Sequence, residues 1–131
     1  MNITMREVMN TMSLYDQIKA IKLPVATAYK FSTLFKALKE HSSFYQDELT
    51  KIIEEYALRD DDGKIISLGQ DTVKLQEDKL DEAQKSFAEL SELEVEVPDV
   101  KFSLEELEKL ELTVSDLEIL TYFIQNEKQG E

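Results

Sequence analysis

The run Asp60-Asp61-Asp62-Gly63-Lys64-Ile65 is the part of this sequence best suited to hold a metal ion. EF-hand calcium loops also place an aliphatic residue two positions after a glycine that follows an acidic ligand. Aligning Gly63 with that glycine puts Asp60 and Asp62 at ligand positions. The same alignment puts Leu58 at the first ligand position and Gly69 where the bidentate glutamate belongs. Because two essential ligands are absent, we interpret the run as a charged turn, with weak divalent binding left open.

Other reactive side chains do not combine into a recognisable catalytic site. His41 is the one histidine and the chain has no cysteine, so a zinc site and a cysteine nucleophile are both excluded. No nucleophile-elbow motif surrounds His41, which we expect to be a partly exposed surface residue. The three glycines cannot form a phosphate-binding loop. We therefore predict no catalytic residue, no metal and no cofactor, and hence a protein that is not an enzyme.

The charge is strongly acidic and unevenly distributed. The net charge is −13, made up of +1 over residues 1–50, −9 over 51–100 and −5 over 101–131. Binding to a phosphate backbone requires a cationic face, so direct nucleic-acid binding is disfavoured. An acidic face attracts basic protein surfaces, or simply keeps the chain in solution. No stretch is apolar enough to span a membrane, and we expect a soluble protein of the cytoplasm.

The elements that must position these residues are predicted to be mainly helical. Thr4 and Glu7 have capping-box spacing, which predicts a helix over 4–22 that ends before Pro24. The next segment carries an unbroken three-four spacing of mostly apolar residues, typical of a heptad seam on one long helix. The seam consists of Ala28, Phe31, Phe35, Leu38, Ser42, Tyr45, Leu49, Ile52 and Tyr56.

A second seam follows a turn and predicts a partner for this helix. Its members are Val73, Gln76, Leu80, Ala83, Phe87 and Leu90, and the Asp62-Gly63 turn lies between the seams. We expect segments 24–58 and 72–91 to pack as a long antiparallel, coiled-coil-like hairpin over 24–91, with a loop at 59–71 that contains a short two-stranded tip.

The C-terminal segment, 93–125, is predicted to be a small α+β tail. Residues 93–97 alternate apolar and acidic side chains, as a half-buried strand does, and Val100 to Phe102 could return beside them. Two capping boxes, Ser103 with Glu106 and Ser115 with Glu118, predict two short helices. Length favours a single domain over 1–131.

Some aromatic and acidic residues fall outside the predicted core and are candidates for partner binding. Tyr29 and Phe44 lie off the seam, where they could pack under the terminal segments or form an exposed patch. Acidic residues crowd the second helix. The candidate partner-binding residues are Tyr29, Phe44, Asp78, Asp81, Glu82 and Phe123.

Several segments, taken in order, resemble a family of small acidic proteins of unknown function that phages and prophages encode. In the first segment, Leu23-Pro24-Val25 leads into Ala28-Tyr29-Lys30. In the second, Glu54-Glu55-Tyr56 is followed by residues 61–65. The closing segment runs from residues 95–98 through 110–113 to Leu120. The N-terminal helix is an addition to that pattern. The resemblance implies a viral origin and no assigned site.

Two functions therefore stay open. The first is a non-enzymatic protein-protein interaction protein with an accessory or assembly role on another phage protein. The second is a host-directed inhibitor whose acidic face mimics nucleic acid. We favour the first, with a phage or host protein as the partner, no membrane, and both homo-oligomerisation and association with the virion left open.

Overall fold

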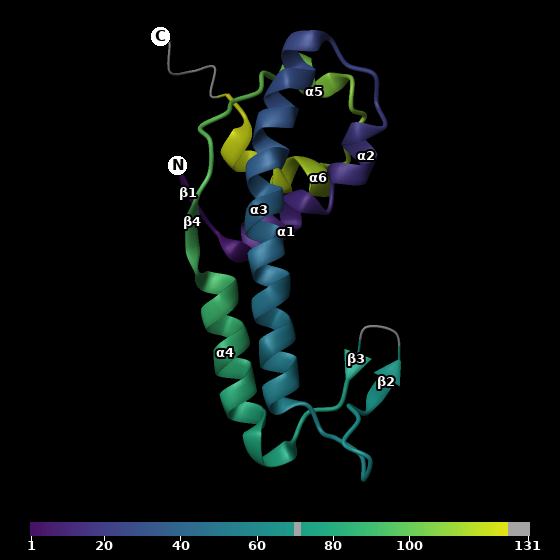
Figure 1. Ribbon diagram of the computed structural model, residues 1–131. Coiled ribbons are helices and arrows are strands. Elements are labelled where there is room, and N and C mark those ends of the chain that lie inside the picture. Colours follow the sequence, from purple (N-terminus) through teal and green to yellow (C-terminus); the bar gives the residue numbers. More distant parts are fainter. Residues whose placement is uncertain (70–71, 126–131) are drawn as a thin grey trace. The chain divides into compact units, whose positions relative to one another are not determined.

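The computed structural model describes residues 1–69 and 72–125 of the chain (Figure 1). The protein is mainly helical, as predicted, and its longest element is α3, Val25–Tyr56. The chain divides into two compact units, each of which is described by itself. Unit 1 comprises Met1–Ser42 with Glu94–Glu131, and unit 2 comprises Ser43–Leu93. The single domain predicted from chain length stays a prediction.

The N-terminal segment of unit 1 contains less helix than we predicted. Strand β1, Asn2–Thr4, comes first, and the capping box of Thr4 and Glu7 then opens α1, Met5–Met12, as expected. The predicted helix over 4–22 is wrong beyond Met12. The Ser13 N–H and side chain bond back to the last turn of α1, and the chain bends at the buried Leu14 before α2, Tyr15–Lys19. Two short helices therefore replace one.

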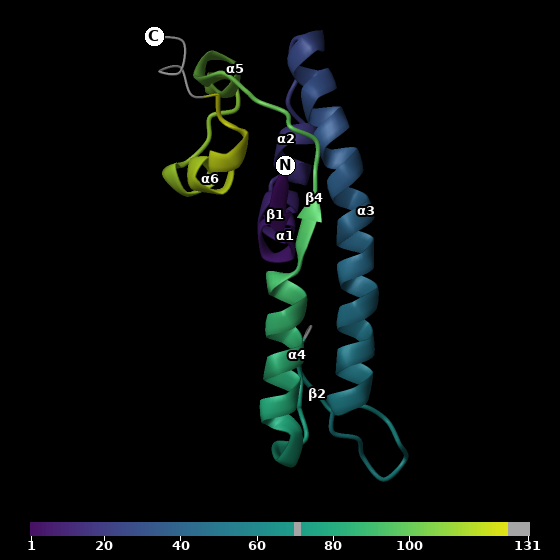
Figure 2. The ribbon, with the colours of Figure 1, turned by 90° about the vertical axis from the view of Figure 1, so that its left-hand side faces the viewer.

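The predicted strand in the C-terminal segment exists, but its partner differs from the one we expected. Strand β4, Glu94–Glu96, pairs antiparallel with β1, placing Val95 opposite Ile3 (Figure 2). The Met1 carbonyl accepts a hydrogen bond from the Val97 N–H, which extends the pairing. The predicted return strand at 100–102 is wrong because Phe102 is buried and forms a parallel bridge with Ile124 instead.

Short capped helices complete unit 1. Ser103 and Glu106 form the predicted capping box of α5, Leu104–Glu108. The box predicted at Ser115 and Glu118 is wrong, because Thr113 and Asp116 cap α6, Val114–Ile119, and a 3₁₀ turn, η2, Thr121–Phe123, follows. These elements cover the apolar faces of α1 and the first half of α3. The resulting core includes Met5, Val8, Phe31, Leu34, Leu38, Phe102, Leu110 and Leu120.

Unit 2 contains a helical pair that is shorter than the predicted hairpin. The second half of α3 lies beside α4, Leu80–Glu92, which runs in the opposite direction (Figures 1 and 2). The predicted helix over 72–91 is wrong for residues 72–79, and α3 has no partner of similar length. Thr72–Val73 forms strand β3, and Glu77–Lys79 forms a 3₁₀ turn, η1. Tyr56, Ala57, Ala83 and Leu90 form the buried core of this unit.

The segment between these helices contains a strand pair, but not in the place that we predicted, since the residues flanking Asp62-Gly63 form an isolated antiparallel bridge between Arg59 and Ile65. Strand β2, Ser67–Gly69, pairs with β3. Three backbone segments also close a ring, in which Leu58 donates to the Lys74 carbonyl, Lys74 to Ile66, and Ile66 to Leu58. This ring keeps residues 72–76 extended. A helical hydrogen-bond pattern at Val73 or Gln76 is therefore excluded, although both residues fit helical spacing.

Residues Asp60–Lys64 form a charged turn, as predicted, closed by hydrogen bonds from the Asp60 N–H to the Lys64 carbonyl and from the Gly63 N–H to the Asp60 carbonyl. Gly63 has φ +80°, a conformation that a glycine adopts without steric cost. The Asp60 carboxylate accepts hydrogen bonds from the N–H groups of Asp62 and Lys64, at 2.9 and 3.0 Å. The Arg59 guanidinium donates to the carbonyls of Gly63 and Glu54, which joins the turn to the end of α3.

Candidate functional site

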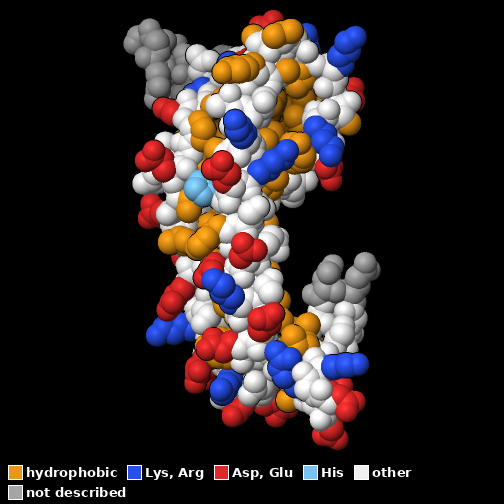
Figure 3. Space-filling view, in the orientation of Figure 1, with side chains coloured by type: hydrophobic (Ala, Val, Ile, Leu, Met, Phe, Trp, Pro, Cys, Tyr) orange, Lys and Arg blue, Asp and Glu red, His pale blue; other side chains and the backbone are white. Residues whose placement is uncertain are grey.

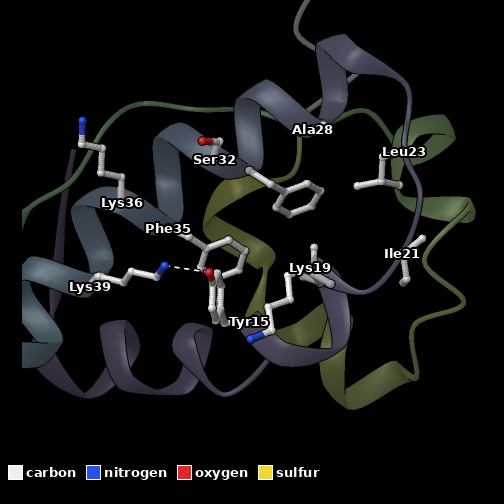
Figure 4. Close-up of a pocket in the computed structure, with 11 residues that line it drawn as sticks. Tyr15, Lys19, Ile21, Leu23, Ala28, Ser32, Phe35, Lys36 and Lys39 are labelled. Atoms are coloured by element: carbon white, nitrogen blue, oxygen red, sulfur yellow. Dashed lines mark hydrogen bonds between the residues drawn. The ribbon is translucent and has the colours of Figure 1, made fainter.

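Unit 1 contains an apolar groove between α2, the linker 20–24 and the first half of α3 (Figure 4). Its volume is about 460 Å³. Helical spacing places Ala28, Phe31 and Phe35 on one face of α3, and the α2 side contributes Ile18, Ile21 and Leu23. We refer to these six residues as the groove floor. Pro24 precedes α3 and fixes where the linker turns into the helix.

Aromatic packing holds the floor in place. The Phe31 ring stacks on Phe102 and Phe35, with centroid distances of 4.1 and 5.9 Å. Phe35 also meets the Tyr15 ring edge-on at 5.1 Å. Such contacts add about 0.5–1.5 kcal/mol per pair beyond burial. The floor is therefore anchored to the core of unit 1.

Lysines border this groove. The Lys39 ammonium donates a 2.6 Å hydrogen bond to the Tyr15 hydroxyl and lies 4.2 Å from the ring centroid (Figure 4). That hydrogen bond lowers the pKa of the Tyr15 hydroxyl, with further lowering from the charges of Lys39 and Lys19. Lys19 approaches the same ring at 5.0 Å and pairs with Asp16 at 3.0 Å. Lys36 extends away from the groove at its outer edge.

These lysines belong to a basic segment in an acidic chain. Residues 15–39 contain five lysines and one aspartate, a balance of +4, whereas the whole chain carries −13. In Figure 3, blue basic groups border a hollowed orange surface in the part of the view that α2 and α3 occupy. Counting charge over residues 1–50 concealed this segment, because Glu40, Asp47 and Glu48, which follow it, offset most of its positive charge. A sliding count would have found it.

Exposed apolar side chains lie on the same helix as the groove floor. Val25 is 86% exposed and Tyr29 is 74% exposed. Val25 lies one turn before the floor residue Ala28, and Tyr29 lies one turn beyond Val25 on the same side of the helix. Of the two arrangements left open for Tyr29, the structure has the exposed one. Phe44 is also exposed, at 46%, but it belongs to unit 2.

The acidic candidates form a separate exposed group in unit 2. Asp78 lies in η1, and Asp81 and Glu82 lie in the first turn of α4. All three are exposed, and no ion pair to them occurs among residues 1–69 and 72–125. Negative charge at a helix N-terminus also stabilises the helix dipole. These carboxylates thus have a structural role whether or not they meet a partner.

Phe123 is not a surface residue, and this candidate is corrected. Its side chain is only 1% exposed, and its carbonyl accepts a 2.7 Å hydrogen bond from the Phe102 N–H. Its neighbour Tyr122 is half exposed instead and hydrogen-bonds the Glu7 carboxylate. The 3₁₀ turn η2 directs adjacent side chains to different sides, so one aromatic residue is buried and the next faces solvent.

A smaller polar cavity of about 370 Å³ lies between α1 and α6. Glu7, Asn10, Ser115, Glu118, Ile119 and Tyr122 line it. Burial raises the pKa of the Glu7 carboxyl, but hydrogen bonds from Tyr122 and Thr4 outweigh that effect and lower it overall. The carboxylate thus already serves the α1 cap and the contact with Tyr122.

The remaining reactive groups have structural partners. A ring nitrogen of His41 lies 2.8 Å from the Glu96 carbonyl oxygen, which ties α3 to β4 within unit 1. Over the described residues, no cluster of three or more His, Asp or Glu side chains is arranged to hold a metal ion. In the same residues, no helix has the length and apolar character needed to cross a membrane.

Comparison with known proteins gives no match. Neither a protein-family model, nor a curated protein, nor a solved structure matches the chain. The groove, the exposed apolar residues and the charge distribution are therefore the features of this chain that bear on its function.

Proposed function

We propose that this chain is a non-enzymatic, phage-type protein-protein interaction protein with an accessory or assembly role on another phage protein. In this proposal it acts in the cytoplasm of the host cell, and the groove of unit 1 is its main contact surface. One observation carries the proposal: a preformed apolar groove is built on α3, and the same helix carries two strongly exposed apolar side chains, Val25 and Tyr29. Contiguous exposed apolar surface on a small protein is typical of an interaction site.

The amino-acid composition of the groove suits a protein partner. Interface cores are enriched in aromatic side chains, and interface rims are polar and solvent-accessible. The groove has aromatic residues on its floor and lysines at its edge. Because Phe31 and Phe35 are packed into the core, they need little ordering on binding, which favours affinity.

A second function, a host-directed inhibitor that mimics nucleic acid, is favoured by a different observation. Asp78, Asp81 and Glu82 are exposed close together in sequence, within a chain of net charge −13. Such a group attracts basic grooves by electrostatic steering. We rank this function second, because the same charges stabilise the start of α4.

Affinity purification with two variants separates these functions. The tagged chain, Lys36→Glu/Lys39→Glu and Asp78→Lys/Asp81→Lys/Glu82→Lys are each expressed in the cells that naturally contain the protein. We expect a partner that the tagged chain and the acidic-group variant retain, and that the lysine variant loses. Loss of the partner from the acidic-group variant alone would favour the inhibitor instead.

Matched controls exclude effects of net charge and folding. Lys85→Glu/Lys109→Glu changes the charge by the same amount as the lysine variant, at two exposed positions outside the groove. Glu55→Lys/Glu89→Lys/Glu108→Lys does so for the acidic variant. Circular dichroism melting of all four variants shows whether each remains folded. Equal capture by every folded variant would contradict both functions.

A further inference from the structure

We propose that the groove of unit 1 binds an acidic, amphipathic segment of the partner protein. Apolar side chains of that segment fill the groove above Phe31 and Phe35, and its carboxylates lie beside Lys39 at the groove and Lys36 at its outer edge. This inference rests on the proposed protein-binding function and specifies the chemistry of the partner.

The volume of the groove suits inserted side chains. A space of about 460 Å³ lies within the range of preformed ligand pockets and is too small for a whole helix. Its outer surface is open in the space-filling view, so a segment lying across it can insert apolar anchors while its backbone stays outside (Figure 3). The exposed Val25 and Tyr29 offer further apolar area along the same helix.

Charge complementarity selects an acidic partner. Of the five lysines in segment 15–39, Lys19 pairs with Asp16 and Lys30 with Glu106. Lys36 and Lys39 border the groove without such a pair among the described residues, in a chain of net charge −13. An acidic segment is attracted to the lysines that border the groove and repelled by most other parts of the chain. Attraction at one face with repulsion elsewhere fixes both the choice of partner and its orientation.

The lysines are available for carboxylates. Lys36 and Lys39 have no carboxylate within ion-pair distance in residues 1–69 and 72–125, although the chain has 28 acidic residues. Lys39 uses one donor on Tyr15, which leaves two donors of its ammonium group for a ligand. Because that contact also restrains the side chain, Lys39 has less conformational freedom to lose on binding.

Selection from a random displayed peptide library tests the inference directly. The library is enriched on the immobilised full chain, and the enriched peptides are then measured by fluorescence anisotropy. We expect enrichment of peptides that combine Asp or Glu with Leu, Ile or Phe. Their affinity should fall about tenfold or more in Lys36→Glu/Lys39→Glu and between about 0.05 and 0.5 M NaCl. Lys85→Glu/Lys109→Glu should change it by less than about threefold.

The remaining outcomes each overturn the inference. Enrichment of neutral or basic peptides, no enrichment, or equal binding by both double variants would contradict an acidic partner. If laurate or a single-stranded oligonucleotide binds saturably and more tightly than the enriched peptides, the groove would be assigned to a different ligand. If sedimentation shows that the chain dimerises, and that dimerisation blocks peptide binding, the groove would be assigned to a second copy of the chain. If purification yields a partner lost by the lysine variant but its contacting segment is not acidic, the proposed function stands and this inference fails.

Discussion

Phe35 is the residue in which the core and the groove meet. Its ring is 4% exposed and contacts both Phe31 and Tyr15. Replacing a buried phenylalanine with alanine removes apolar burial and leaves a cavity. We therefore expect Phe35→Ala to lower the free energy of unfolding by about 3–5 kcal/mol, measured by urea denaturation. Phe44→Ala, at a half-exposed position, serves as the control and should cost less than about 1 kcal/mol. Equal costs would contradict the burial of Phe35.

Glu106 makes the stability of unit 1 depend on pH, with stability falling at acidic pH. Hydrogen bonding to Lys30, together with the Ser103 N–H and Thr27 hydroxyl, lowers the pKa of the Glu106 carboxyl from 4.5 to about 2. The Lys30 ammonium lies 2.9 Å from this carboxylate, and Thr27 donates at 2.8 Å. Because the folded-state pKa lies below the unfolded one, the stabilisation is fully present above pH 4.5 and is lost as the pH falls toward about 2.

A pH series tests this residue. Lys30 is partly exposed, so solvent screening reduces the stabilisation to about 1–2 kcal/mol. We expect Glu106→Gln to destabilise by that amount at neutral pH and by almost nothing near pH 2, as measured by denaturant unfolding. Glu105→Gln, its exposed neighbour, is the control for loss of charge. A difference from wild type that stays constant over this pH range would contradict the assignment.

The helix cap at Thr113 is the clearest test at the scale of a single element. The Thr113 hydroxyl accepts a hydrogen bond from the Asp116 N–H at 3.1 Å, and the Asp116 carboxylate accepts one from the Thr113 N–H at 3.2 Å. We expect Thr113→Ala to cost about 1 kcal/mol in thermal unfolding. Ser115→Ala, at the position that sequence spacing favoured, should cost less than about 0.5 kcal/mol. A larger cost for Ser115→Ala than for Thr113→Ala would indicate that Ser115 caps the helix, as the sequence spacing predicted.

The Asp60–Lys64 turn is expected to hold its shape without metal. Two backbone N–H groups bond to one oxygen, Oδ1, of the Asp60 carboxylate, and Arg59 donates to the Gly63 carbonyl. Adding chelator should therefore leave the circular dichroism spectrum and the melting curve unchanged. Adding calcium should raise the melting temperature by less than about 1 °C, since weak binding to an exposed turn adds little stability. A calcium-dependent rise of several degrees would contradict the charged-turn interpretation, and magnesium provides the comparison for ion specificity.

At the scale of the whole molecule, the excess of negative charge opposes folding. A net charge of −13 on 131 residues produces self-repulsion in the compact state. Salt screens that repulsion, with a Debye length of about 30 Å at 0.01 M and about 8 Å at 0.15 M. We expect the melting temperature to rise by a few degrees over this range of NaCl, measured by circular dichroism. Choline chloride should act equally if screening is the cause, whereas an effect of sodium alone would indicate a bound cation.

The sequence by itself determined features whose causes lie within a few residues. Three-four spacing predicted α3, and capping-box spacing correctly placed the starts of α1 and α5. Asp62-Gly63 predicted the turn between the two helices of unit 2, because glycine alone adopts its conformation without strain. Each of these structures depends on side chains and hydrogen bonds inside a single segment.

Only the tertiary structure decided which distant segments meet. The pairing of β4 with β1, the late start of α4 and the burial of Phe123 all depend on partners far along the chain. The groove arises in the same way, since its floor combines residues of α2, the linker and α3. Local spacing shows that a residue is apolar and on which face it lies. Whether another segment covers that face is set by backbone pairing and packing across the whole unit, which no local pattern specifies.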